Sequence, residues 1–112
     1  MLQLPDAARA LSALAQEGRL AAFKLLVEAG SDGLPAGEIA RRLDILPNTL
    51  STQLTILSHA GLVRSRRKGR SVIYHADYDG MGELLAFLVA DCCAGRPEIC
   101  APFAAAALNA CR

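Results

Sequence analysis

Apolar side chains recur every three or four residues through the first thirty positions, a spacing typical of amphipathic helices. Residues 6–16 predict a first helix, with Asp6 placed to cap its start. A second helix follows Gly18 and ends at Gly30, because glycine suits the position just past a helix end. The pattern therefore predicts two N-terminal helices over residues 6–30.

The next segment has the pattern of two short helices joined by a tight turn. The predicted elements are a helix at residues 35–43 that begins at Pro35, a turn at 44–46, and a helix from Pro47 to about residue 60 that Gly61 ends. Three leucines of the second helix recur at helical spacing and should face the core: Leu50, Leu54 and Leu57. Residues 35–61 are thus predicted to form a helix-turn-helix.

A hairpin is predicted directly after this segment. Residues 62–65 and 71–75 alternate apolar and polar side chains or are β-branched, as strands do. The residues between them form a basic tip: Arg66, Arg67, Lys68, Gly69 and Arg70. Residues 62–76 therefore predict a two-stranded wing that follows the helix-turn-helix.

A strongly apolar helix is predicted over residues 79–93. Its apolar side chains are too many for one thin stripe: Leu84, Leu85, Phe87, Leu88 and Val89. A helix that is apolar over so much of its girth favours burial on two sides, which in a small domain indicates a dimer seam. The remaining residues, 94–112, form a tail that contains cysteines and a short helix from about residue 101.

The chain of 112 residues has room for one domain, and its composition, 53% hydrophobic and 21% charged, is that of a globular protein. A core of this size gains from oligomerisation. We therefore expect a single domain over residues 1–112. Its predicted fold is mainly α (α+β): a winged helix-turn-helix with a two-stranded β-hairpin wing, which forms a homodimer through its N- and C-terminal helices.

The net charge of +1 conceals an asymmetry. Residues 1–76 hold ten Lys and Arg against six Asp and Glu, a balance of +4, whereas residues 77–112 hold two against five, a balance of −3. This distribution predicts a basic working surface in the first part of the chain. No segment reaches the roughly 18 apolar residues that cross a bilayer, and residues 1–16 lack a basic leader. We therefore expect a cytoplasmic protein with no membrane partner.

The polar face of the helix from Pro47 predicts contact with double-stranded DNA. It carries small hydrogen-bonding side chains able to reach base edges and phosphates: Asn48, Thr49, Ser51, Thr52, Gln53 and Thr55. An ordinary amphipathic helix also has a polar face, but residues 48–59 contain no Glu, Asp or Lys, which a merely solvated helix would normally carry. In the hairpin, four cations around one glycine favour phosphate or minor-groove contact over a solvated turn: Arg66, Arg67, Lys68 and Arg70.

These segments also resemble a known family. Residues 48–63, NTLSTQLTILSHAGLV, resemble the recognition helix of the ArsR/SmtB metalloregulatory repressors, and residues 19–26 and the hairpin are similar to that family's early helix and wing. The likeness covers about residues 10–90. It implies a homodimeric repressor that binds an operator of two half-sites and releases it when an inducer binds. Gln53 stands where the family usually has histidine in the middle of the recognition helix.

Cysteines gather near the C-terminal end of the last strong helix. Cys92, Cys93 and Cys100 lie within nine residues, and Cys111 follows. Buried cysteines that extend the dimer seam are one interpretation, since Cys92 lies four residues after Leu88. A ligand site is favoured, because three thiols flank a helix end and a Gly/Pro break.

The donor set indicates which ligand such a site would take. There is no histidine after His75, so the site would be all sulfur, and soft thiolates select soft ions. Three thiolates suit trivalent arsenic or antimony, whereas zinc usually takes four ligands. We therefore predict arsenite as the inducer, with antimonite or another thiophilic ion as alternatives. If Cys111 is a fourth ligand, zinc, cadmium or lead stays open.

The resemblance bears on the same cysteines. A vicinal cysteine pair with a third cysteine beyond the final helix resembles the arsenite-responsive family variant with C-terminal cysteines. Other metals, mercury among them, and a redox or persulfide signal with a bridge between Cys93 and Cys100 are the alternatives. A thiol enzyme is not expected, because both histidines lie in the DNA-binding half and the cysteine region is acidic.

Overall fold

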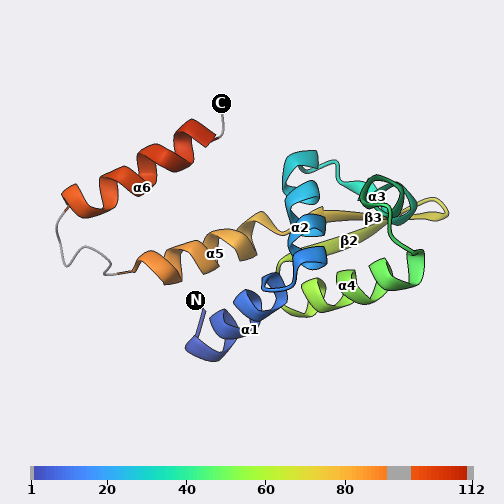
Figure 1. The fold of residues 1–112 in the computed structure, drawn as a ribbon, viewed down its shortest axis with the longest axis horizontal. Coiled ribbons are helices and arrows are strands. Elements are labelled where there is room, and N and C mark those ends of the chain that lie inside the picture. The colour runs from blue at the N-terminus through green and yellow to red at the C-terminus, as the bar shows by residue number, and fades with distance from the viewer. Residues whose placement is uncertain (1, 91–96, 111–112) are drawn as a thin grey trace.

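The computed structural model describes residues 2–90 and 97–110. Its elements in chain order are α1 (Leu4–Leu14), α2 (Glu17–Ala29), β1 (Leu34–Pro35), α3 (Ala36–Leu43), α4 (Pro47–His59), β2 (Val63–Lys68), β3 (Ser71–Ala76), α5 (Tyr78–Val89) and α6 (Pro97–Ala110). Helices α2, α3 and α4 surround the small sheet, and α1 and α5 lie at the end opposite the tip of the β2–β3 hairpin (Figure 1). This is the mainly helical, winged helix-turn-helix architecture that the sequence predicts.

The core is built almost entirely from aliphatic side chains. Six of them are nearly inaccessible to solvent: Leu26, Ile39, Leu50, Leu54, Leu57 and Leu62. The stripe of three leucines predicted on α4 therefore faces the core, and that prediction is confirmed. Helix α1 buries only alanines, Ala7, Ala10 and Ala13, whose small side chains let it approach α2 and α4 closely.

Helix α1 begins two residues earlier than predicted. Asp6 caps the start as predicted, but from inside the first turn: its carboxylate accepts from the backbone N–H of the N-cap residue, Gln3, at 3.2 Å, in a capping box. The helix stops at Leu14 because Gln16 starts the next one, where its side chain accepts from the N–H of Arg19 at 2.8 Å.

The turn between α3 and α4 is made by three residues, as predicted. Asp44 adopts a left-handed conformation with φ of 54°, which aspartate tolerates better than most residues. The chain then reverses quickly, and the N–H of Ile45 donates to the carbonyl of Ala40 at 3.1 Å. The turn fixes the angle at which α4 leaves α3.

The sheet has three strands in the order β1-β3-β2, one more than the predicted hairpin. The added strand is the two-residue β1, in which Leu34 pairs with Tyr74 and Pro35 with Ile73. The sequence placed Pro35 in the first turn of α3. In the structure it belongs instead to the edge strand β1. A strand of two residues has no detectable alternation. Proline has no N–H to donate to a neighbouring strand, so within sheets it is found at edges, as here.

The hairpin is longer than predicted, and its basic residues are mostly strand residues. Arg66, Arg67 and Lys68 pair across β2–β3 with Ile73, Val72 and Ser71. Only Gly69, with φ of 63°, and Arg70 form the turn. The prediction that the tip comprises residues 66–70 is wrong, because the charged side chains of Arg66, Arg67 and Lys68 hide the strand pattern of β2.

The C-terminal helices also differ from the prediction in their bounds. Asp77 caps α5 by accepting from the N–H of Gly80 at 2.9 Å, and the helix ends at Val89 instead of residue 93. Helix α6 begins at Pro97, four residues before the predicted start of the tail helix. Among the described residues, no helix is long and apolar enough to cross a membrane.

Two glycines of α5 allow a test of how the helix packs. A Cβ atom at Gly80 would collide with the carbonyl oxygen of Gly61, whereas a Cβ at Gly82 would meet nothing within 4 Å. Gly80→Ala should therefore lower the free energy of unfolding by about 1–3 kcal/mol through overpacking. Gly82→Ala should keep or raise stability, since alanine is the better helix former by about 1 kcal/mol. Thermal denaturation followed by circular dichroism measures both, and equal stabilities for the two variants would contradict the packing described here.

Candidate nucleic-acid interface

The outer face of α4 is polar and uncharged. Five of the six predicted residues are exposed: Asn48, Thr49, Ser51, Thr52 and Thr55. The hydroxyls of Thr52 and Thr55 donate to the carbonyls of Asn48 and Ser51, at 3.2 and 2.9 Å. Their oxygens remain acceptors, while the Asn48 amide and the Thr49 and Ser51 hydroxyls keep their donors.

Gln53, the sixth residue, does not face outward. Its side chain is half-buried and turned toward α2, where a Cβ atom at Gly18 would lie 2.5 Å from its Nε2 atom. Its Oε1 atom is buried without a hydrogen-bond partner among the residues described. The predicted outward placement of Gln53 is wrong, because only the absence of a side chain at Gly18 creates the space it occupies.

The wing divides its cations between two faces. Successive side chains of a strand point to opposite sides, so Arg66 and Lys68 share one face of β2 and Arg67 lies on the other. Arg66 donates to the carbonyls of Ser31 and Asp32, at 3.2 and 2.8 Å. It thus ties the wing to the loop before β1, a role that the sequence did not predict.

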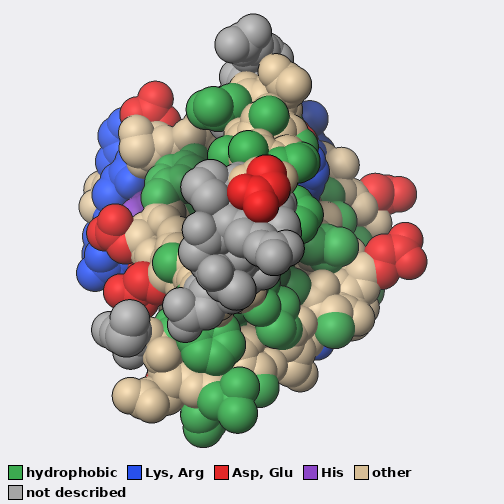
Figure 2. Space-filling view, turned by 90° about the vertical axis from the view of Figure 1, so that its left-hand side faces the viewer, with side chains coloured by type: hydrophobic (Ala, Val, Ile, Leu, Met, Phe, Trp, Pro, Cys, Tyr) green, Lys and Arg blue, Asp and Glu red, His purple; other side chains and the backbone are tan. Residues whose placement is uncertain are grey.

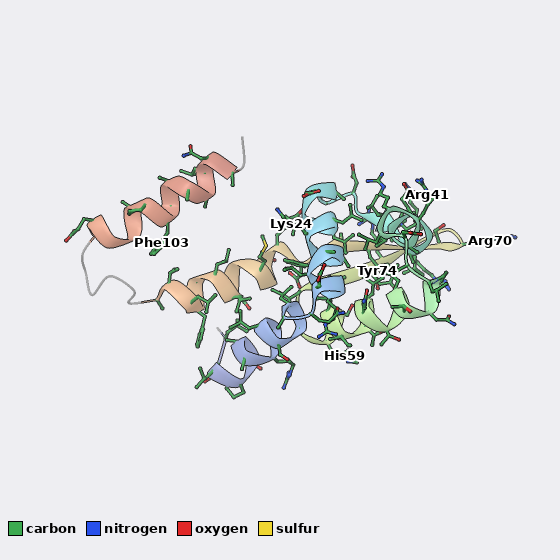
Figure 3. All side chains as sticks on the ribbon, in the orientation of Figure 1. Lys24, Arg41, His59, Arg70, Tyr74 and Phe103 are labelled. Atoms are coloured by element: carbon green, nitrogen blue, oxygen red, sulfur yellow. The ribbon has the colours of Figure 1, made fainter. Side chains whose placement is uncertain are left out.

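The other wing cations stay available for a partner. Arg67, Lys68 and Arg70 are exposed and, in the part of the chain that the structure describes, none of them forms an ion pair. Arg70 projects at the far end of the wing (Figure 3). Cations held this way can meet phosphate oxygens without first breaking a salt bridge.

Helix α3 carries two further arginines that are already paired. Glu38 forms ion pairs with Arg41 and Arg42, the latter at 2.9 Å. Hydrogen bonds from Arg41, and to a smaller extent from Arg42, lower the pKa of Glu38 to about 2. The carboxylate stays ionised at neutral pH and offsets part of the positive charge of this helix.

A basic hollow between α1, α2 and α4 contains residues that the sequence analysis missed. Arg9, Ser12, Arg19, Ile56 and His59 line most of a pocket of about 240 Å³. His59 lies at the C-terminal end of α4 (Figure 3). No sequence signal joins these residues, because they come from three helices whose packing brings them together.

The predicted cysteine site falls largely outside the described residues. Cys92, Cys93 and Cys111 lie outside them, and Cys100 belongs to α6. Within residues 2–90 and 97–110, no group of three or more His, Cys, Asp or Glu side chains is placed to hold a metal ion. The thiol site remains a prediction.

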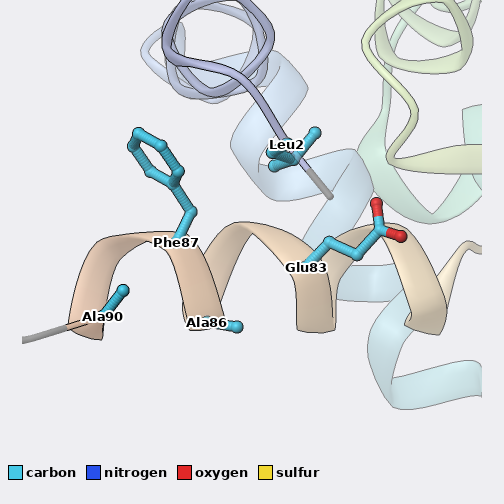
Figure 4. A pocket seen from close by; sticks show the side chains of 5 residues that line it. All are labelled: Leu2, Glu83, Ala86, Phe87 and Ala90. Carbon is cyan, nitrogen blue, oxygen red and sulfur yellow. The ribbon is translucent and has the colours of Figure 1, made fainter.

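The end of the molecule formed by α1 and α5 is apolar. Leu85, Leu88 and Val89 of α5 are about half exposed, at 53%, 48% and 47%. Figure 2 looks onto this end and shows hydrophobic side chains gathered over it. Beside them is an apolar hollow of about 320 Å³ between Leu2 and the α5 residues Ala86, Phe87 and Ala90, with Glu83 at one side (Figure 4).

The fold, the uncharged polar helix and the basic hairpin together define a winged helix-turn-helix protein. A family model described as a helix-turn-helix domain matches residues 14–66. The chain is 31% identical to a structure from Mycobacterium bovis, a homodimeric winged helix-turn-helix DNA-binding domain of a possible ArsR-family transcriptional regulator. That match covers 79% of this chain and 81% of that one, with a TM-score of 0.65. The chain belongs to the ArsR family of helix-turn-helix transcriptional regulators, which are not enzymes.

Two further relatives have more specific descriptions. The biofilm growth-associated repressor of Agrobacterium fabrum is 40% identical over 58 residues, which make up 52% of this chain and 50% of the repressor. The chain thus spans about half the length of that curated relative. A solved structure described as a possible transcriptional regulator for arsenical resistance is 28% identical, with 70% of this chain and 79% of that one covered and a TM-score of 0.62.

Proposed function

We propose that the chain is a homodimeric transcriptional repressor that binds operator DNA and releases it when trivalent arsenic binds Cys92, Cys93 and Cys100. The observation that carries the DNA-binding part is the exposed face of α4, which has five small hydrogen-bonding side chains and no carboxylate. The wing adds cations that form no ion pair within the described part of the chain. Carboxylates on that face would repel DNA, and hydroxyls and amides read base edges.

In this proposal, α4 enters the major groove and the wing follows the backbone. A recognition helix contacts base edges mainly through its N-terminal residues, which here include Asn48, Thr49 and Ser51. Leu46 precedes the helix and its side chain cannot cap it, so no side chain in the described residues accepts from the first N–H groups of α4, and they can bind a phosphate. Arg67 and Arg70 then supply sequence-independent contacts to phosphates or the minor groove.

The dimer is proposed to form through α1 and α5. Half-exposed leucines on α5 and the adjacent apolar hollow are surfaces that an isolated chain would leave in water at a cost of about 25 cal/mol per Å². Leu4 and Leu11 of α1 are exposed on the same part of the molecule, at 71% and 42%. A second copy that packs there would cover them, and the Mycobacterium bovis relative is homodimeric.

The inducer part of the proposal depends on the thiols. Three cysteines without histidine favour a soft, three-coordinate ion such as trivalent arsenic. One relative is a possible regulator of arsenical resistance, which supports the same choice. Helix α5 ends at Val89, and Cys100 belongs to a separate helix, α6. A ligand that joins them would therefore draw the start of α6 toward the end of α5, beside the proposed dimer seam.

Asn48 and Gln53 provide a matched test of DNA reading on one helix. Asn48→Ala removes an exposed amide, and we expect it to weaken binding at the cognate duplex by about 1–3 kcal/mol and to relax base preference. Gln53→Ala removes an inward side chain and should leave base preference unchanged. The measurement is fluorescence anisotropy on a duplex selected by the protein from a random library, with single-base variants of that duplex. An Asn48→Ala protein with the parent's affinity and base preference would overturn the docking of α4.

A further inference from the structure

The basic hollow at the C-terminal end of α4 brings together cationic side chains from three helices. Arg9 from α1, Arg19 from α2 and His59 from α4 converge on it, with the Ser12 hydroxyl at its wall. Within the described part of the chain, neither arginine nor His59 has a carboxylate within ion-pair distance. Three nitrogen-bearing side chains without an internal acid favour an anionic ligand.

Hydrogen bonds to the end of α1 fix the position of the Arg19 side chain. Its Nε atom donates to the carbonyl of Ala13 at 2.6 Å, and a terminal nitrogen donates to the carbonyl of Ser12 at 3.4 Å. Both carbonyls belong to the last turn of α1, and that of Ser12 also accepts from the N–H of Ala15 at 3.1 Å. A guanidinium has five N–H donors, so these bonds fix its position and leave others for a ligand.

The hollow continues the face of α4 that is proposed to meet DNA. His59 follows Thr52 by seven residues, almost two full turns, so the two side chains project from the same side of the helix. The 13 residues of α4 span about 20 Å, whereas the major groove is about 12 Å wide. With the N-terminal residues at the base edges, the C-terminal end therefore reaches the flanking sugar-phosphate backbone.

We infer that Arg9, Arg19 and His59 form a binding site for a backbone phosphate of the operator, at the end of α4 opposite the tip of the wing. This inference rests on the proposed DNA-binding function. The recognition helix is then bracketed by cationic contacts, Arg70 and its neighbours near one end and this site at the other (Figure 3). The site adds affinity and fixes the register of α4 without reading sequence.

The test is the salt dependence of duplex binding by Arg9→Gln, which removes the exposed charge of the site and leaves the structural role of Arg19 intact. Each phosphate contact contributes about 0.9 to the slope of log K against log salt, so the dimer should lose about 1.8. Between 50 and 200 mM salt, its affinity should then fall about tenfold less than the parent's. Arg9→Lys keeps the charge and should restore most of the slope.

Lys24→Gln is the matched control, because it removes one exposed positive charge from α2 at a position away from α4 (Figure 3). It should bind with the parent's slope. If Arg67→Ala lowers the slope and Arg9→Gln does not, the phosphate site is overturned while the proposed function stands. If the parent binds no duplex, both fail. Saturable binding of inorganic phosphate that depends on Arg9, with the parent's slope for Arg9→Gln on DNA, would also overturn the inference.

Discussion

Cys100→Ser is expected to yield a protein that binds its duplex with the parent's affinity and holds it at arsenite concentrations that release the parent. Serine is close to cysteine in size, so the start of α6 should be undisturbed. A hydroxyl is a poor ligand for a thiophilic ion, and the loss of one of three ligands leaves an incomplete site. We expect the arsenite concentration for half release to rise at least tenfold. Anisotropy of the labelled duplex, titrated with arsenite under a thiol-free reductant, measures this shift.

Cys111→Ser is the control for that experiment, since it removes a thiol outside the proposed ligand set. It should release the duplex at the parent's arsenite concentration. Release of the Cys100→Ser protein at that same concentration would exclude the three-thiol site. Parallel titrations with antimonite, cadmium, lead, mercury and zinc rank the other thiophilic ions. Release by an oxidant or a persulfide donor, without any response to arsenite, would favour the redox alternative over metal sensing.

Leu88→Asp should convert the dimer to monomers and remove most of the operator affinity. Leu88 on α5 is 48% exposed, and in the proposed dimer the partner covers this exposed part of its side chain. A carboxylate placed there would be buried without a partner, which costs several kcal/mol. Loss of the second half-site contact should weaken binding by about 10²–10⁴-fold, because both recognition helices no longer bind as one unit. Light scattering after size-exclusion chromatography gives the oligomeric state, and anisotropy gives the affinity.

Leu20→Asp is a closely matched control, because Leu20 is exposed to the same extent, 48%, but lies on α2. It should remain dimeric. A dimeric Leu88→Asp protein with a native circular dichroism spectrum would exclude α5 from the seam. Monomers of the parent that bind the full operator as tightly as predicted for a dimer would remove the need for a dimer altogether.

The elements that could be predicted are those whose side-chain pattern is long enough to repeat. The leucine stripe of α4 spans two turns, and it faces the core as expected. Strand β1, with two residues, has no period to detect, and the strand character of Arg66–Lys68 is hidden by uniform positive charge. Several helix ends lie one to four residues from their predicted positions, because caps such as Asp77 and Gln16 compete with neighbouring candidates of similar propensity.

The candidate site was predicted less completely than the fold, for a physical reason. Residue type shows which side chains can bind DNA, but tertiary packing decides which of them are free to do so. Gln53 turns inward because Gly18 leaves room for it, and Arg66 is held by the carbonyls of Ser31 and Asp32. Arg9, Arg19 and His59 meet only in the folded chain. Each of these outcomes depends on contacts between distant segments.

The space above Gly18 gives this protein a way to change its operator without any change in the recognition helix. A side chain at position 18 would occupy the volume that now holds the amide of Gln53, since its Cβ would already lie 2.5 Å from Nε2. The Gln53 amide would then have to move aside, and if its side chain turned to the exposed face of α4 it could pair with adenine. A single mutation on α2, remote from the bases, would then give the protein a preference for one further base in its operator. Divergence in target choice among such regulators could therefore arise in the scaffold behind the recognition helix.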